Sequence, residues 1–153
     1  MRLTLLALLL AGCGAVAPPM EVAERCAAGD LTVEVERGSS AVCAQELVGL
    51  SAVRDLYQER FGHLDLTGIR VRVRATDYVP MPDGRLDVAG ATWVDAIDLA
   101  ANHTPGLGHE LNHVRTGTGH AGWCIDFEPW QEQVLGYESR SYLGCPNPHG
   151  GTP

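Results

Sequence analysis

The sequence has no run of basic residues and no apolar segment long enough to cross a membrane. Its 11 Lys and Arg are scattered among 19 Asp and Glu, and the formal net charge is −8. This balance argues against a nucleic acid as partner, because nucleic-acid binding depends on clustered cations. The apolar run at residues 3–11 is about half as long as a transmembrane helix needs to be. Internal repeats are also absent, so the 153 residues are expected to form one small domain.

The amino terminus has the parts of an export signal. Arg2 supplies a positive start, residues 3–11 supply the apolar part, and the run ends in Leu10-Ala11-Gly12-Cys13. This ending resembles the lipobox of bacterial lipoprotein precursors, which implies cleavage before Cys13 and acylation of its thiol. We therefore expect residues 1–12 to be a signal peptide and residues 13–25 to be a lipidated cysteine with a tether. The domain would be exported to the bacterial cell envelope and held on a membrane through Cys13.

The other cysteines form no Cys-x-x-Cys pair, which disfavours a zinc site built from cysteines. Cys26, Cys43, Cys124 and Cys145 instead suggest two disulfides, as in many small exported domains. Three pairings are possible. We prefer Cys26–Cys43 and Cys124–Cys145, because each pairing closes a short loop.

Hydrophobic periodicity predicts an α+β domain at residues 26–145, with a disordered tail at 146–153. The expected elements are a strand at 31–36, a helix at 44–61 ended by Gly62, a strand at 68–74, a loop at 76–85, two antiparallel strands at 86–94 and 96–101, a helix that starts near Thr104 and ends at Gly117, a connector at 121–127 and a helix at 129–143 broken by Gly136. This order favours helices packed on one side of a small sheet.

Three arginines alternate with apolar residues in the strand at 68–74. Arg70, Arg72 and Arg74 are therefore expected on the face away from the core, toward solvent or acidic neighbours. A solvated sheet face is the simpler interpretation in an acidic protein, and an anion-binding face is the alternative.

The segment His109-Glu110-Leu111-Asn112-His113 carries the strongest functional signal. His109 and His113 lie four residues apart, so on a helix they share one face and can supply two ligands of a zinc ion. Glu110 lies about 100° round the helix. From there its carboxylate can act as general base on a metal-bound water. Thr104 is expected to cap this helix, and Gly117 to end it in the left-handed conformation.

This motif resembles that of the zincin metallopeptidases. The resemblance implies a zinc-dependent peptidase with a small mixed sheet, a backing helix at 44–61 and an active-site helix. It also implies an edge strand that pairs with an extended peptide substrate, for which residues 96–101 are the candidate. Tyr137 or Tyr142 would donate to the oxyanion. We expect a monomer that acts on peptides or proteins.

The third metal ligand depends on the subclass. Metzincins continue the motif as His-Glu-x-x-His-x-x-Gly-x-x-His, and here Gly117 and His120 keep the Gly-x-x-His ending one residue late. Gluzincins take a Glu from a later helix, where Glu132 and Glu128 are candidates. We expect His120 to be the ligand, with Glu132 and then Glu128 as alternatives.

Two other functions are compatible with the residues. A non-catalytic zincin-like lipoprotein could bind a metal or a partner protein, and a disulfide-stabilised structural domain could carry the motif by accident. Glu110 favours the peptidase, because metal binding alone does not require it. Asn112 is expected on the helix surface. Trp123 and Trp130 could line a cleft, although core packing is favoured. The substrate and the identity of the divalent metal stay open.

Overall fold

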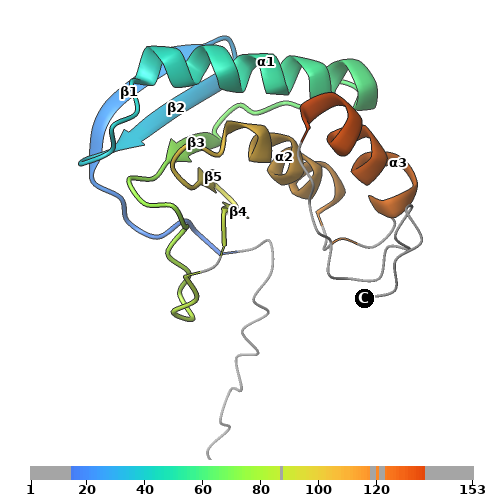
Figure 1. The fold of residues 1–153 in the computed structure, drawn as a ribbon. Coiled ribbons are helices and arrows are strands. Elements are labelled where there is room, and N and C mark those ends of the chain that lie inside the picture. Colours follow the sequence, from blue (N-terminus) through green and yellow to red (C-terminus); the bar gives the residue numbers. More distant parts are fainter. Residues whose placement is uncertain (1–14, 87, 118–119, 121–122, 137–153) are drawn as a thin grey trace, which may run out of the picture.

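A five-stranded mixed sheet organises the structure, a computed structural model that describes residues 15–86, 88–117, 120 and 123–136 (Figure 1). The strands are β1 (Val22–Ala28), β2 (Leu31–Glu36), β3 (Arg70–Val73), β4 (Gly90–Thr92) and β5 (Ala96–Leu99). Their order in the sheet is β1-β2-β3-β5-β4. β2, β3 and β5 run parallel, whereas β1 and β4 pair antiparallel at the two edges.

The helices contribute to one hydrophobic core on the apolar side of this sheet. They are α1 (Cys43–Phe61), α2 (Leu107–Thr116), which follows the 3₁₀ turn η1 (Thr104–Gly106), and α3 (Trp123–Trp130), which continues into the π-helical turn η2 (Gln131–Leu135). α1 lies over β1 and β2, and α2 lies beside β4 and β5 (Figure 1). Within the described residues, none of the helices is both long and apolar enough to cross a membrane.

The α+β class and the helices on one side of the sheet are confirmed. The hydrophobic core joins Val33, Val71 and Ile97 from neighbouring strands to Leu50 of α1 and Leu111 of α2. Helix α1 ends at Gly62, whose φ of 91° and N–H bond to the Gln58 carbonyl are those of a glycine that stops a helix.

Three local predictions are wrong. Residues 22–25 belong to β1 and not to a tether, so the folded chain begins before residue 26. β1 escapes prediction because it is an edge strand with mostly exposed side chains, which leaves no apolar alternation to read. The connector expected at 121–127 becomes α3 from Trp123 onward. Thr104 does not cap α2, because its hydroxyl donates to Glu46 of α1 instead.

The prediction of which strand lies at the edge beside α2 is also wrong. Residues 96–101 were expected at the edge of the sheet, but β5 lies between β3 and β4 and both of its sides are paired. The strand just before it in the chain, β4, takes the edge position. Any extended peptide that joins the sheet next to α2 would therefore pair with β4.

The second face of the sheet carries a row of ion pairs. Arg25, Glu34, Arg72 and Asp98 lie opposite one another on β1, β2, β3 and β5. Arg72 donates to both carboxylate oxygens of Asp98 at 2.5 and 2.6 Å. Glu34, Arg72, Arg74 and Asp98 are each at most 5 % exposed. All three arginines thus meet acidic neighbours, and Arg72 and Arg74 are buried there, whereas Arg70 stays partly exposed.

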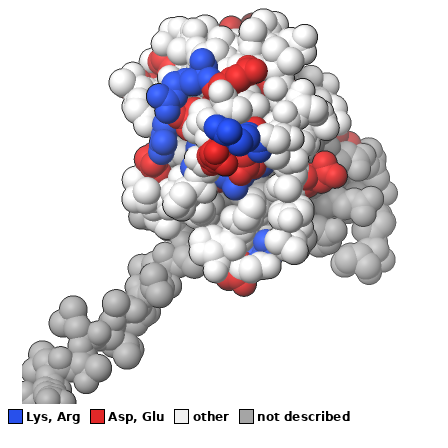
Figure 2. Space-filling model, turned by 90° about the vertical axis from the view of Figure 1, so that its left-hand side faces the viewer, with Lys and Arg blue, Asp and Glu red and all other residues white. Residues whose placement is uncertain are grey.

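The surface on this side reflects the pairing of opposite charges. Figure 2 shows Lys and Arg (blue) and Asp and Glu (red) mingled near the centre of the face turned to the viewer, with no large area of one sign. Arg74 pairs with Glu36 at 3.1 Å, and Arg70 pairs with Asp95. Mixed charges of this kind do not generate the field that would attract a polyanion.

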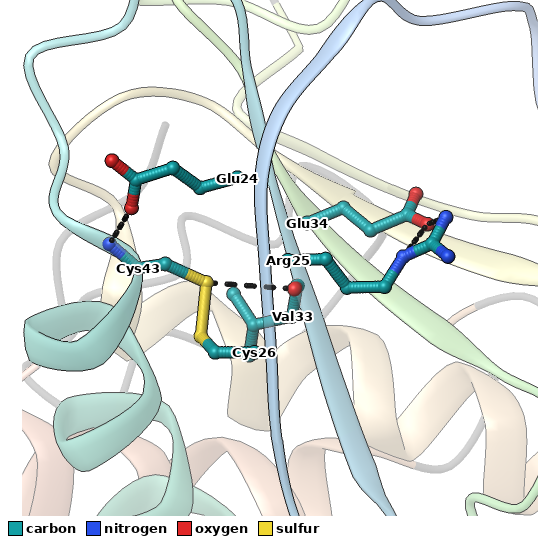
Figure 3. The surroundings of a disulfide bond; sticks show 6 residues. All are labelled: Glu24, Arg25, Cys26, Val33, Glu34 and Cys43. Atoms are coloured by element: carbon teal, nitrogen blue, oxygen red, sulfur yellow. Dashed lines mark hydrogen bonds and ion pairs between the residues drawn. A yellow bond between two sulfur atoms is a disulfide. The ribbon is translucent and has the colours of Figure 1, made fainter.

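The predicted disulfide between Cys26 and Cys43 is confirmed. It joins β1 to the first residue of α1, with 17 residues of sequence separation (Figure 3). Glu24 of β1 adds a second link, because its carboxylate accepts the Cys43 backbone N–H at 3.0 Å. Edge strand and helix start are thereby held together. Cys145 lies outside the described residues, so the predicted Cys124–Cys145 pair remains a prediction.

Replacing Cys26 and Cys43 together by Ala should lower the free energy of unfolding by about 3 kcal/mol, the amount expected for cross-linking a loop of this length. Chemical denaturation of the oxidised protein and of the double variant measures the difference. Reduction of the wild-type protein is the control and should reproduce most of the loss. Equal midpoints for both proteins would contradict the role assigned to this bond.

Candidate metal centre

Three histidines meet at the end of α2. The ring centroids of His109, His113 and His120 lie 4.9 to 5.0 Å apart in all three pairs. Each ring can place one nitrogen so that the three nitrogens lie within 4.8 Å of one another. This group could hold a metal ion, and it is the only such group of three among the described residues.

The local sequence explains how the third ring reaches the other two. His109 and His113 share a face of α2 because they lie four residues apart. Gly117 then ends the helix with φ 64° and ψ 8°, and its N–H bonds to the His113 carbonyl, as predicted. This left-handed residue turns the chain back, a conformation that costs glycine little. His120 is thereby brought beside the helix face that it follows in sequence.

Trp123 packs against all three histidines. Its ring centroid lies 4.9 Å from that of His109, 4.6 Å from that of His113 and 4.7 Å from that of His120. Trp123 is 3 % exposed, and Phe127 lies behind it at 5.1 Å. The indole therefore restricts the rotation of the three imidazoles and excludes water from one side of the group. Trp123 belongs both to the core and to this site.

The histidine group suits a divalent metal such as zinc. Burial, and then the nearby His113, His120 and His103, lower the pKa of His109 to about 3, so its ring is neutral and able to ligate. Nε2 of His109 lies 3.0 Å from Nε2 of His120. Two nitrogens bound tetrahedrally to one zinc lie about 3.3 Å apart. The His109–His120 pair would therefore open slightly, and the wider-spaced nitrogens of the group, which lie up to 4.8 Å apart, would move closer. Nδ1 of His109 is buried and has no hydrogen-bond partner among the described residues.

Glu110 points to the edge strand instead of joining the histidine group. Its carboxylate Oε2 accepts a hydrogen bond from the Thr92 hydroxyl of β4 at 2.8 Å. A Cβ on Gly90 would lie 2.5 Å from the other carboxylate oxygen, so β4 needs a glycine here to leave room for Glu110. The acid is thus held between the ligand-bearing helix and the edge of the sheet.

Burial raises the pKa of Glu110 to about 7, with Asp98 adding to the rise and the Thr92 hydrogen bond opposing it. An acid with this pKa can both accept and donate a proton near neutral pH. Its environment, and not its sequence motif, sets this property.

The raised pKa of Glu110 predicts a pH-dependent effect of Glu110→Gln on the metal-free protein. Below the unfolded-state pKa of about 4.5 the Glu is protonated in both states and resembles Gln, so both proteins should be equally stable. As the pH rises to 7 the native state must ionise a buried acid, and the wild type should lose about 3 kcal/mol relative to the variant.

Denaturation in urea at pH 4.5 and pH 8 tests this difference. The lowered pKa of His109 makes both proteins less stable in acid and cancels in the comparison. A constant difference between the two proteins at both pH values would contradict the assigned environment of Glu110.

The rotation of α2 is fixed by a buried hydrogen-bond cluster that the motif does not reveal. Asn112 was expected on the helix surface, but it is fully buried and its Oδ1 accepts from the Tyr57 hydroxyl of α1 at 2.9 Å. Arg115 donates to both Asn112 and Tyr57. The pKa of Tyr57 is raised by burial, an effect that Arg115 partly offsets. This cluster attaches α2 to α1.

Other candidate residues lie elsewhere. Glu128 and Glu132 are not part of the histidine group, and Glu132 is exposed on η2. Trp130 packs against Tyr57 and Phe61 in the core. Tyr137 and Tyr142, the predicted oxyanion donors, lie outside the described residues. Thr92 and Gly90 were missed, because no local pattern in the sequence links them to Glu110.

Comparisons with protein-family models, with curated proteins and with solved structures each find no match. What the fold and the site establish is therefore the class: a mixed α+β domain with a three-histidine group that could hold a metal ion.

Proposed function

We propose that this protein is a zinc-dependent peptidase in which Glu110 is the general base. The observation that carries the proposal is the convergence of His109, His113 and His120 at α2, the helix that also carries Glu110, a buried acid of matched pKa. Three imidazole ligands would leave one position of a tetrahedral ion open for water, which is the arrangement of catalytic and not of structural zinc. Zinc would supply Lewis acidity and lower the pKa of that water.

The chain's own residues account for the proton transfers. Glu110 accepts a proton from the attacking water and returns one to the leaving amine, which requires a pKa near the working pH. Thr92 orients the carboxylate through its hydroxyl. Trp123 and Phe127 keep one side of the histidine group dry, which strengthens the electrostatic interactions there.

The edge strand supplies a place for the substrate. β4 has one paired side, toward β5, and its Thr92 contacts Glu110. An extended peptide added antiparallel or parallel to β4 would place its backbone beside the general base. Recognition through backbone hydrogen bonds fits polypeptides better than small molecules.

We also propose that the protein is an exported lipoprotein, as the ending Leu10-Ala11-Gly12-Cys13 suggests. Support comes from the disulfide between Cys26 and Cys43, because such bonds persist in oxidising compartments. A divalent ion other than zinc would be held by the same residues with lower affinity in most cases.

A test needs protein from an oxidising compartment, with Cys13→Ser to keep it soluble. Bound metal should be close to one zinc per chain, and a mixed peptide library should be cleaved. Removal of zinc by a chelator should stop cleavage, and added zinc should restore it. Stoichiometric zinc without any cleavage would instead favour the metal-binding lipoprotein, for which the contact of Glu110 with Thr92, away from the histidine group, is the supporting observation.

The choice of third ligand gives a separate prediction. His120→Ala should weaken zinc binding by at least about 100-fold, because it removes one of three protein ligands. Glu132→Ala should leave zinc affinity unchanged, since Glu132 is exposed on η2. Titration against a competing zinc chelator measures both. Equal zinc affinities in the two variants would remove His120 from the site.

A further inference from the structure

The segment before β1 is bound to the sheet and is not a loose tether. The Ala15 carbonyl accepts the Val94 backbone N–H at 3.0 Å, and the Ala17 N–H donates to the Asp95 carboxylate at 2.9 Å. The Pro18 carbonyl accepts from buried Arg72 at 2.7 Å. We call residues 15–21 the strap. It is fixed from its first described residue, beside the turn that joins β4 to β5.

The strap and its neighbours form one end of the molecule, which we call the strap pole. It consists of residues 15–18, 76–86, 88 and 93–95. Ala17, Val79, Met81 and Trp93 pack together in a second, smaller core beneath it. In Figure 1 this end lies at the bottom, and α1 lies at the top.

The strap pole exposes large apolar side chains. Val16, Leu86 and Val94 are 70 %, 61 % and 58 % exposed. Arg85 pairs with Asp83 at 2.7 Å, and Asp95 pairs with Arg70 of β3. Asp77 is exposed, so the pole keeps a negative net charge. The lower part of the face in Figure 2 is mostly white. Because its net charge is negative, this end is suited to contact a neutral lipid surface and not an anionic one.

We propose that the strap pole lies on the membrane surface and that β4 receives polypeptide chains held close to that surface. The sequence next to the pole indicates that lipid is what contacts it. Cys13, the residue that the lipobox pattern marks for acylation, precedes Ala15 by two residues, which can span at most about 7 Å. Acyl chains on Cys13 therefore hold the pole close to the membrane. Because the strap is hydrogen-bonded to the domain, this also limits how the domain can be oriented on the membrane.

The position of the strap limits the substrate class. The same short segment carries Thr92, which contacts Glu110, and Val94, which bonds to the strap. The edge strand is thus fixed near the lipid anchor, and segments of membrane proteins or other lipoproteins next to the bilayer reach it before free peptides do. This part of the inference rests on the proposed peptidase function, whereas the orientation on the membrane does not.

Photo-crosslinking to lipid tests the orientation without any activity assay. The mature, acylated chain is reconstituted into phosphatidylcholine vesicles that contain a photoactivatable phospholipid, and labelled peptides are identified by mass spectrometry. Labels should concentrate in residues 15–18, 76–86, 88 and 93–95. The control site is Val48, which is 73 % exposed on α1, the helix at the other end of the fold in Figure 1. Equal labelling of both regions, or an unmodified Cys13 thiol, would overturn the proposal.

A longer linker separates a fixed orientation from simple attachment. Twelve Gly and Ser residues inserted between Gly14 and Ala15 would give the anchor a reach of about 20 Å without touching the strap. Pole labelling should then fall several-fold relative to α1, and Val16→Ser with Leu86→Ser and Val94→Ser should act in the same direction. Val48→Ser should change nothing. Unchanged labelling in the linker variant would overturn the proposal.

The substrate class is tested with one reporter peptide in two forms, free in solution and attached to lipid by a short spacer. The wild type should cleave the attached form preferentially, and the linker variant should lose that preference. Equal cleavage of both forms by the wild type would overturn the substrate inference. Labelling of the pole with no cleavage of either form would support the orientation and remove the proposed function, so the two failures are distinguishable.

Discussion

Replacing Glu110 with Gln is expected to lower peptide cleavage by about 10²- to 10⁴-fold, the usual contribution of a positioned general base. Gln keeps the shape of the side chain and can still accept the hydrogen bond from Thr92. It cannot take a proton from water at neutral pH. Zinc content should stay at one per chain, because Glu110 is not among the three histidine ligands that we propose.

Steady-state cleavage of one peptide, with zinc measured on the same samples, decides this prediction. The loss should fall mainly on kcat, since a general base acts in the transition state more than in substrate binding. Glu59→Gln is a matched control, because Glu59 is an exposed glutamate of α1 that should not affect cleavage. If the Glu110→Gln variant cleaved the peptide at the wild-type rate, the peptidase proposal would be contradicted, even with zinc bound.

The histidine group could be predicted from the sequence because its geometry depends on a short segment of the chain. A spacing of four fixes His109 and His113 on one helix face, and Gly117 allows the return that brings His120 back within a few residues. Helix periodicity and a left-handed glycine are properties of short segments. The same holds for α1 and its end at Gly62, and for the short disulfide loop from Cys26 to Cys43.

The surroundings of Glu110 could not be predicted, because they depend on chain segments that meet only in the folded protein. Thr92 is 18 residues from Glu110, and Tyr57 is 55 residues from Asn112. Neither pair forms a motif. Strand order has the same origin: β5 reads as an edge strand by its position before the helix, yet β4 folds back outside it. Registers across a sheet follow from packing and not from local pattern.

The arginine row shows how an alternating pattern can be read correctly and still mislead about burial. Period-two alternation places Arg70, Arg72 and Arg74 on the face away from the core, as predicted. The sequence does not show that the strap would cover that face, with the Pro18 carbonyl on Arg72. Nor does it show that Asp98 would lie directly opposite Arg72 in the parallel register. Alternation reports the face on which a residue lies, whereas burial depends on what else packs there.

Burial of this row leads to the largest expected effect on stability. Arg72→Met should lower the free energy of unfolding by about 3–5 kcal/mol, because it leaves a buried carboxylate without its main partner. Asp98 is fully buried, and its next cation is Arg74 at 3.8 Å. The same substitution removes the hydrogen bond from Arg72 to Pro18, so part of the loss should come from the strap.

The double variant Arg72→Met/Asp98→Leu should recover most of the lost stability. Replacing a buried ion pair by apolar side chains of similar volume is often neutral, since neither charge then has to be desolvated. Arg74 keeps Glu36 as partner in this variant. Denaturation of the wild type, both single variants and the double variant forms a complete cycle. Additive losses in the double variant would show that Arg72 and Asp98 act independently, and the row would then stabilise the fold through packing and not through paired charge.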